Sequence, residues 1–99
     1  LLLKGAPTLV SDERGALYVN PTGNPGMATA GAGDVLSGCI GALWGQGMER
    51  TEAAYAGAYV HGLAGDLARA RFGERGLTAS DLEHFLPASL LAVESVTAR

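Results

Sequence analysis

The residues best suited to chemistry form the short stretch Gly31-Ala32-Gly33-Asp34. If a helix begins here, the backbone N–H groups of its first turn lack helical partners, and with the helix dipole they favour an anion such as phosphate. Asp34 is the only charged side chain between residues 23 and 38. A carboxylate beside a phosphate site can take a proton from a hydroxyl that attacks a terminal phosphoryl group. The simpler interpretation is that Asp34 is a helix N-cap, which is worth about 1 kcal/mol.

This stretch differs from the two best-known phosphate-binding motifs. No Gly-Lys-Ser/Thr follows it, as in a Walker A loop, and Leu36 stands where the dinucleotide-binding fingerprint has its third glycine. The four residues alone therefore leave the ligand open.

The segments before the stretch predict short strands and a loop. Residues 1–4 predict a buried strand, and the β-prone runs 8–11 and 16–19 around the polar turn 12–15 predict a hairpin. Residues 20–26 are rich in glycine and proline and predict a loop.

A helix is predicted from about Asp34, with Gly47 as its C-terminal stop. Gly38, Gly41 and Gly45 recur along one of its faces. Each interior glycine costs roughly 1 kcal/mol of helix propensity, so we expect this face to pack closely against a sheet or another helix.

The rest of the chain predicts further helices. An Ala-rich helix is predicted over 51–72, and the S-x-x-E capping pattern of 80–83 predicts the start of another. Pro87 is typical of the first turn of a fourth helix. Strands, then a glycine loop, then helices favour an α/β fold with the loop at a strand-to-helix junction.

Composition limits the class of protein. The chain has 99 residues, of which 47% are hydrophobic, and a net charge of -3. We expect one domain or part of one, no nucleic-acid partner because no basic stripe is present, and no membrane span because apolar runs are short. Its lone cysteine, Cys39, fits a reducing compartment, and we expect a cytoplasmic protein. Because the chain starts without Met inside a strand-like run, we expect the C-terminal piece of a larger domain.

Other polar residues have structural interpretations. His61 lies mid-helix beside glycines and is interpreted as a hydrogen-bonded structural histidine. Asp66 is predicted to pair with Arg69 or Arg71 on the same helix. Cys39 falls on the apolar stripe of its helix and is interpreted as a core residue.

The stretches "NPTGNPGMATAGAGDVLSG", "GALWGQG" and "YVHGLAGDLA", with the leading "LLLKGAPT" and the later "GLTASDL", carry a family resemblance. The chain resembles, from Leu1 to about Leu86, the C-terminal part of the ADP/ATP-dependent NAD(P)H-hydrate dehydratases of the ribokinase-like superfamily. The resemblance implies a three-layer αβα fold, of which residues 1–99 would be the C-terminal part. It also implies a repair reaction, in which nucleotide-driven phosphorylation of (S)-NAD(P)H hydrate is followed by loss of phosphate.

The resemblance further implies partners for the reaction. These are ADP or ATP as co-substrate, Mg²⁺ with the nucleotide, and an NAD(P)H-hydrate epimerase, which in this family is often fused upstream. A homo-oligomer is also expected.

Individual roles follow from the same resemblance. The nucleotide site would be lined by Lys4, Gly5, Ala6, Pro7 and Thr8, which match the family's K-G-x-x-T stretch. Gly33 would contact the nucleotide phosphates, and Asp34 would contact the hydrate and act as base toward its hydroxyl. Ala32 stands where Ser or Thr is usual, which removes a hydroxyl but no backbone N–H. The second-ranked residues of the anion loop are Asn24, Met27, Ala28, Thr29, Gly31 and Ala32.

Two other functions stay open from the sequence. A small-alcohol or vitamin-precursor kinase would share the G-x-G-D element, although the preceding N-P-G-M-A-T favours the dehydratase. A non-catalytic nucleotide-binding or assembly module is the other, because strands expected upstream are missing from these residues. The preference between ADP and ATP is likewise open.

Overall fold

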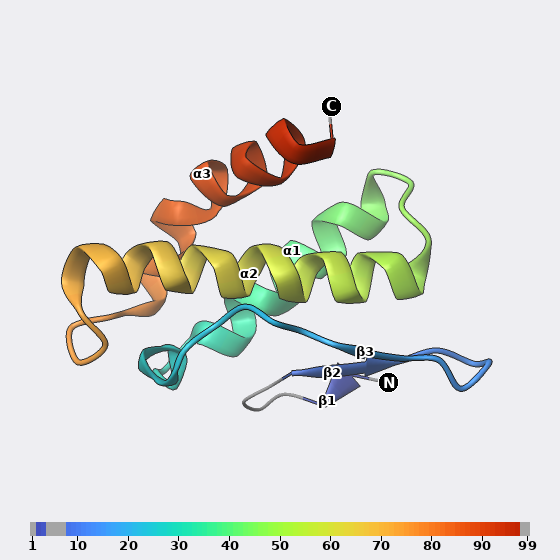
Figure 1. The fold of residues 1–99 in the computed structure, drawn as a ribbon, viewed down its shortest axis with the longest axis horizontal. Helices are drawn as coiled ribbons and strands as arrows, with labels where there is room; N and C mark the ends of the chain where they lie inside the picture. Colours follow the sequence, from blue (N-terminus) through green and yellow to red (C-terminus); the bar gives the residue numbers. More distant parts are fainter. Residues whose placement is uncertain (1, 4–7, 98–99) are drawn as a thin grey trace.

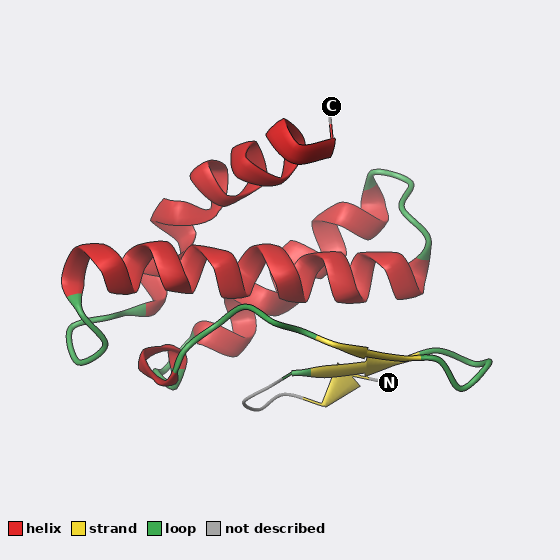
Figure 2. Ribbon diagram, in the orientation of Figure 1, coloured by secondary structure: helices red, strands yellow, loops and turns green. Residues whose placement is uncertain are grey.

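Three short strands form an antiparallel sheet in the computed structural model, which describes residues 2–3 and 8–97 (Figure 2). The strands β1 (Leu2–Leu3), β2 (Leu9–Ser11) and β3 (Leu17–Val19) lie in the order β1-β2-β3. Leu9 pairs with Val19 and Ser11 with Leu17, which confirms the predicted hairpin. The first strand is confirmed over residues 2–3, although Leu2 is half-buried and not buried.

Three helices make up most of the molecule: α1 (Ala32–Gly45), α2 (Arg50–Phe72) and α3 (Ala79–Thr97). Figure 1 shows α2 running the length of the molecule, with α3 on one side and the sheet on the other. A short 3-10 helix, η1 (Pro25–Met27), lies within the loop that leads from β3 to α1. Among the described residues, no helix combines the length and apolarity needed to cross a bilayer.

The main buried cluster joins α1, α2 and the start of α3. Its members, all largely withdrawn from water, are Ala32, Val35, Ala68, Leu77 and Leu82. The first turn of α1 is thus fixed to the core by its own apolar side chains, and this places the Gly31–Asp34 stretch against a packed base.

The prediction of a separate fourth helix at Pro87 is wrong, because Pro87 lies inside α3. A proline in a helix interior removes one backbone hydrogen bond. Contacts with the core keep the helix continuous on both sides: Leu82 is fully buried before Pro87, and after it the buried Ser89 hydroxyl donates to the Val60 carbonyl at 2.7 Å.

The start of α3 also differs from the prediction. Ser80 lies inside the helix, and the reciprocal capping bonds join Thr78 and Asp81 instead. The Thr78 N–H donates to Asp81 Oδ2 at 2.9 Å, and the Asp81 N–H donates to Thr78 Oγ1 at 3.3 Å. Two overlapping capping patterns stand in the sequence, and the one nearer the preceding turn is used.

The expected close packing of the α1 glycine face is not found among the described residues. A Cβ at Gly38, Gly41 or Gly45 would meet nothing within 4 Å. The close approaches lie on α2: a Cβ at Gly57 would come within 2.5 Å of Ile40 Cγ1, and one at Gly62 would clash with Thr22. The glycines of α2, which have no side chain, therefore let α1 and the loop after β3 approach this helix closely.

Candidate functional site

The helix α1 begins at an unusual cap. Gly31 is its N-cap, with φ 88°, and it provides no side-chain hydrogen bond. This left-handed conformation favours glycine, and a Cβ here would also lie 3.2 Å from the Ala79 side chain of α3. The turn is held tightly while its cap leaves backbone donors unused.

Two of these donors make no hydrogen bond to the part of the chain that the structure describes. The N–H groups of Ala32 and Val35 donate to carbonyls of the preceding loop. Those of Gly33 and Asp34 have no hydrogen-bond partner among the described residues. Unpaired N–H groups at the positive end of a helix dipole form a setting that attracts anions.

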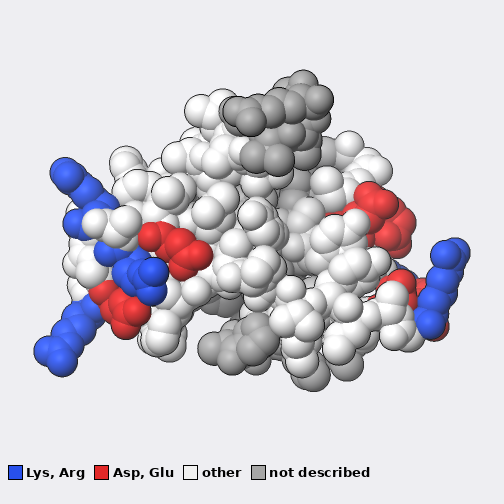
Figure 3. All heavy atoms as spheres, in the orientation of Figure 1, with Lys and Arg blue, Asp and Glu red and all other residues white. Residues whose placement is uncertain are grey.

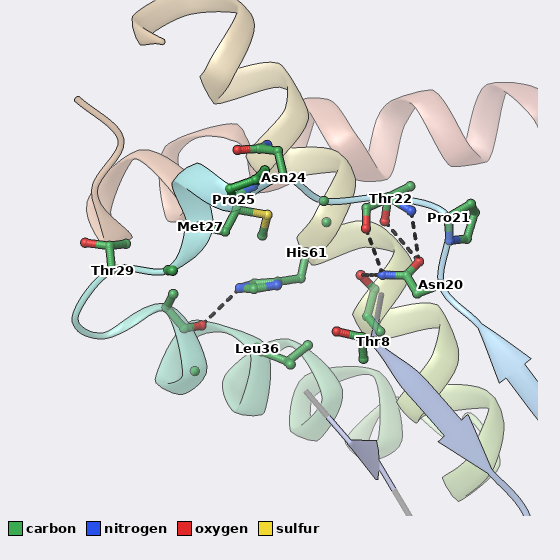
Figure 4. Close-up of a pocket in the computed structure, with 16 residues that line it drawn as sticks. Thr8, Asn20, Pro21, Thr22, Asn24, Pro25, Met27, Thr29, Leu36 and His61 are labelled. Carbon is green, nitrogen blue, oxygen red and sulfur yellow. Dashed lines mark hydrogen bonds between the residues drawn. The ribbon is translucent and has the colours of Figure 1, made fainter. Parts of the chain in front are cut away.

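A pocket of about 950 Å³ opens beside this turn (Figure 4). Its walls come from the loop after β3, the first turns of α1 and the middle of α2, and its size is within the usual range for small-molecule sites. The residues that line it are Thr8, Asn20, Pro21, Thr22, Gly23, Asn24, Pro25, Met27, Ala28, Thr29, Ala32, Gly33, Leu36, Ala58, His61 and Gly62.

Most of the described residues predicted for the site meet at this pocket. Those among its lining are Thr8, Asn24, Met27, Ala28, Thr29, Ala32 and Gly33. Gly31 and Asp34 adjoin the lining residues Ala32 and Gly33 without themselves lining the pocket. Lys4, Gly5, Ala6 and Pro7 lie outside the described residues.

The interpretation of Asp34 as an N-cap is wrong. Because the cap is Gly31, Asp34 is the third residue of α1, and it is exposed. Its carboxylate makes no hydrogen bond or ion pair within the part of the chain that the structure describes. An acidic group in a first turn gains from the helix dipole, and here it stays exposed next to the pocket-lining Gly33.

The loop after β3 is tied to α2 by hydrogen bonds. Asn20 Nδ2 donates to the Ala58 carbonyl at 2.9 Å, and Thr22 Oγ1 donates to the Tyr59 carbonyl, also at 2.9 Å. Gly62 gives Thr22 the room to lie on the helix surface. These bonds make the loop a fixed wall of the pocket.

Asp66 holds the next part of the same loop. Its carboxylate accepts from the Gly23 N–H at 3.1 Å and from Asn24 Nδ2 at 2.9 Å. The predicted pairing with Arg69 or Arg71 is wrong, since the loop brings two donors that are remote in sequence to the same carboxylate.

Asn24 is used mainly within the loop. Besides its bond to Asp66, its Oδ1 accepts from the Gly26 N–H at 3.0 Å, and it caps η1. The side chain of Met27 then packs over Gly65 of α2, where a Cβ would clash with it. Asn24 therefore shapes the pocket wall.

His61 joins α2 to the first turn of α1, and the expectation of a hydrogen-bonded structural histidine is confirmed. It is 8% exposed, and its Nε2 lies 3.0 Å from the Ala32 carbonyl oxygen (Figure 4). Sequence reasoning did not assign it to the pocket, which it lines.

The thiol of Cys39 is half-buried in α1, and this burial raises its pKa above the ordinary value. A raised pKa keeps the thiol protonated and weakly nucleophilic. Among the described residues, no group of three or more His, Cys, Asp or Glu side chains is placed to hold a metal ion.

Comparison with known proteins gives a family. The family model described as NAD(P)H-hydrate dehydratase matches residues 1–88. The chain belongs to the NAD(P)H-hydrate dehydratase family. This agrees with the resemblance carried by the G-A-G-D element and its flanking stretches.

Relatives within the family are much longer. The chain is 55% identical over 94 residues to a bifunctional NAD(P)H-hydrate repair enzyme of Moorella thermoacetica, covering 95% of this chain and 18% of that protein. It is 48% identical over 83 residues to an ADP-dependent (S)-NAD(P)H-hydrate dehydratase of Neisseria meningitidis, covering 83% of this chain and 28% of that protein. The chain thus spans less than a third of these relatives.

Proposed function

We propose that this chain is the nucleotide-binding and base-carrying part of an enzyme that restores NAD(P)H from (S)-NAD(P)H hydrate, using ADP as phosphoryl donor. The family and the name of the Neisseria relative support the reaction and the choice of ADP. The observation that carries the proposal is the turn at Gly33 and Asp34. On these neighbouring residues stand an N–H at the pocket wall and an exposed carboxylate, and neither has a partner among the described residues.

In this proposal the Gly33 N–H and the α1 dipole hold the phosphates, and Asp34 acts on the hydrate. The Asp34 carboxylate takes the proton of the ring hydroxyl while the oxygen of that hydroxyl attacks the terminal phosphorus of ADP. The bond from that phosphorus to the bridging oxygen breaks and AMP leaves. The carbon–oxygen bond of the phosphorylated hydrate then breaks with the electron pair going to the departing phosphate, the neighbouring ring carbon loses a proton to solvent, and the dihydropyridine results.

The nucleotide would lie along the pocket toward the sheet. Thr8 lines the pocket just before β2, and by the family resemblance the nucleotide site would also include Lys4, Gly5, Ala6 and Pro7. Met27, Ala28, Thr29 and Ala32 would form the wall next to the phosphates.

Mg²⁺ fits this arrangement as a companion of the nucleotide. Magnesium is commonly bound through substrate phosphates and water, and among the described residues no group of three or more His, Cys, Asp or Glu side chains would hold the ion by itself. When bound, the ion would neutralise charge on the phosphates.

The wider setting belongs to the same proposal. Residues 1–99 would form the C-terminal part of a ribokinase-like three-layer αβα domain in a cytoplasmic homo-oligomer. The word "bifunctional" in the name of the Moorella relative supports a fused NAD(P)H-hydrate epimerase.

The proposal is tested by incubating the full-length protein with (S)-NADH hydrate, Mg²⁺ and either ADP or ATP. Dihydropyridine absorbance should return only when nucleotide is present, and faster with ADP; hydrate without nucleotide is the control. No return despite measurable nucleotide binding would reject the proposal and favour the small-alcohol kinase or a non-catalytic module.

A further inference from the structure

His61 occupies the crossing of α2 and the first turn of α1, and the mechanism above gives it no task. It is buried, it lines the pocket, and its Nε2 lies 3.0 Å from the Ala32 carbonyl oxygen (Figure 4). A carbonyl oxygen only accepts hydrogen bonds, so Nε2 carries the hydrogen in this contact.

The bond acts on a peptide unit that also belongs to the pocket. The Ala32 carbonyl and the Gly33 N–H share one planar trans peptide, so the two groups point in opposite directions. A bond that fixes the Ala32 oxygen therefore also fixes where the Gly33 N–H points. That N–H has no partner among the described residues, and Gly33 lines the pocket.

The peptide unit between Ala32 and Gly33 lies in a turn that has no side-chain cap. Glycines stand on both sides of Ala32, at 31 and 33, and glycine has the greatest backbone freedom. The N-cap offers no side-chain bond, and helix ends fray when they are not held. The histidine adds, from a neighbouring helix, a side-chain hydrogen bond to a turn that is otherwise held by backbone bonds and by the burial of Ala32 and Val35.

We propose that His61 is a positioning residue, which orients the Gly33 N–H toward the phosphates through its hydrogen bond to the Ala32 carbonyl. The inference rests on the proposed function in one respect only: it takes an adenine nucleotide as the ligand of this pocket.

The test compares His61→Phe, which keeps a ring but loses the donor, with His61→Gln, which keeps an N–H donor. Dissociation constants for ADP and for adenosine are measured by calorimetry in the full-length protein. His61→Phe should weaken ADP binding about tenfold, the usual size for one lost hydrogen bond to a charged ligand's site, and leave adenosine binding unchanged. His61→Gln should recover most of the ADP affinity. Equal weakening of ADP and adenosine, or unchanged ADP affinity in His61→Phe, would overturn the inference.

A second measurement needs no His61 variant. In ¹⁵N-glycine-labelled protein, the Gly33 amide signal is identified by its loss in Gly33→Ala, and ADP is added to saturation. The signal should shift strongly, and an unshifted signal would overturn the inference even if His61→Phe failed to fold. Because neither readout uses the hydrate, a protein that shows both effects without restoring NADH would reject the proposed function alone.

Discussion

Asp34 is the single side chain on which the proposed chemistry depends. It stands exposed in the first turn of α1, next to the unpaired N–H of Gly33, and it has no partner among the described residues. The carboxylate of a helix N-cap accepts hydrogen bonds from backbone N–H groups. The Asp34 carboxylate makes no such bond and is available to accept a proton.

Replacing Asp34 by Asn should therefore abolish turnover while sparing binding. The amide has the same shape but cannot act as the base, a role worth roughly 100- to 10,000-fold in rate. Hydrate turnover and ADP affinity are measured in the full-length protein, with Glu83→Gln, an exposed carboxylate change on α3, as control. Near-normal turnover in Asp34→Asn would remove this residue from the role of base.

Glu49 gives a prediction for pH. As N-cap of α2 it accepts hydrogen bonds from the backbone N–H groups of Thr51 and Glu52, at 3.0 and 3.1 Å, and these bonds lower its pKa. A lowered folded-state pKa means that the stabilisation is complete above the unfolded-state value and is lost as the pH falls through the folded-state pKa.

The free energy of unfolding of the full-length protein and of Glu49→Gln is compared by urea titration from about pH 7 to about pH 3. The unmodified protein should be the more stable at neutral pH, and the difference should shrink at the acid end. A difference that is constant over this range would show that the cap bonds do not depend on ionisation.

Contacts between remote residues limited what could be predicted at this scale. The family resemblance marked Gly33 and Thr8 for the nucleotide site, and both line the pocket. Asp66 was misassigned because helical spacing offered it Arg69 and Arg71, while its actual partners, Gly23 and Asn24, reach it through the fold.

At the scale of elements, two substitutions at the start of α3 distinguish the Thr78–Asp81 capping pattern from the Ser80–Glu83 pattern. Thr78→Ala should lower stability by about 1 kcal/mol, because it removes the hydroxyl that accepts the Asp81 N–H. Ser80→Ala is the matched control and should change stability little, since Ser80 lies exposed inside the helix. The free energy of unfolding of both variants is measured by chemical denaturation. A larger loss of stability in Ser80→Ala than in Thr78→Ala would reject Thr78 as the capping residue.

The two glycine faces provide a second matched pair. Gly65→Ala should lower the free energy of unfolding by about 1–3 kcal/mol, because the new methyl would overlap the Met27 side chain. Gly41→Ala should raise it by about 0.5–1 kcal/mol, since no described atom lies within 4 Å of the new Cβ and alanine favours the helix.

Thermal unfolding of the two glycine variants gives the sign of each change. Destabilisation by Gly41→Ala would mean that the glycine face of α1 is covered in the full-length protein.

Local patterns predicted the hairpin, α1 and α2 because alternation, helical periodicity and terminal glycines agree there. Pro87 led to the wrong prediction of a separate helix. A proline is typical of a first helical turn, but it is also tolerated inside a helix that packing holds together. The 3-10 helix at Pro25–Met27 was predicted only as loop, since its cap bond from Gly26 to Asn24 has no periodic signature.

At the scale of the whole molecule, one helix organises the candidate site. Residues 58–66 of α2 bind both walls of the pocket. The loop wall is held by the hydrogen bonds of Asn20 and Thr22 to α2 carbonyls and by the Asp66 carboxylate, and the α1 wall is held by His61. The glycines in this segment could be seen in the sequence, but which segments would lie on them could not, because that depends on contacts across some forty residues.

In the view of Figure 3, the charged side chains that are coloured lie toward the two ends of the molecule. The ion pairs Arg50–Glu13 and Arg69–Glu74 are exposed, so they add little stability. Large apolar side chains that are exposed in this chain include Trp44 and Leu91. The relatives, of which this chain spans less than a third, have much more polypeptide to place around such a surface.

The most direct test of the proposed reaction is to measure the amounts of all three products in one sample. Full-length protein is mixed with (S)-NADH hydrate, ADP and Mg²⁺, and dihydropyridine absorbance is followed beside AMP and phosphate in the same sample. NADH, AMP and phosphate should appear in equal amounts, and none should appear with Asp34→Asn. AMP formed without NADH, or NADH formed without AMP, would contradict it.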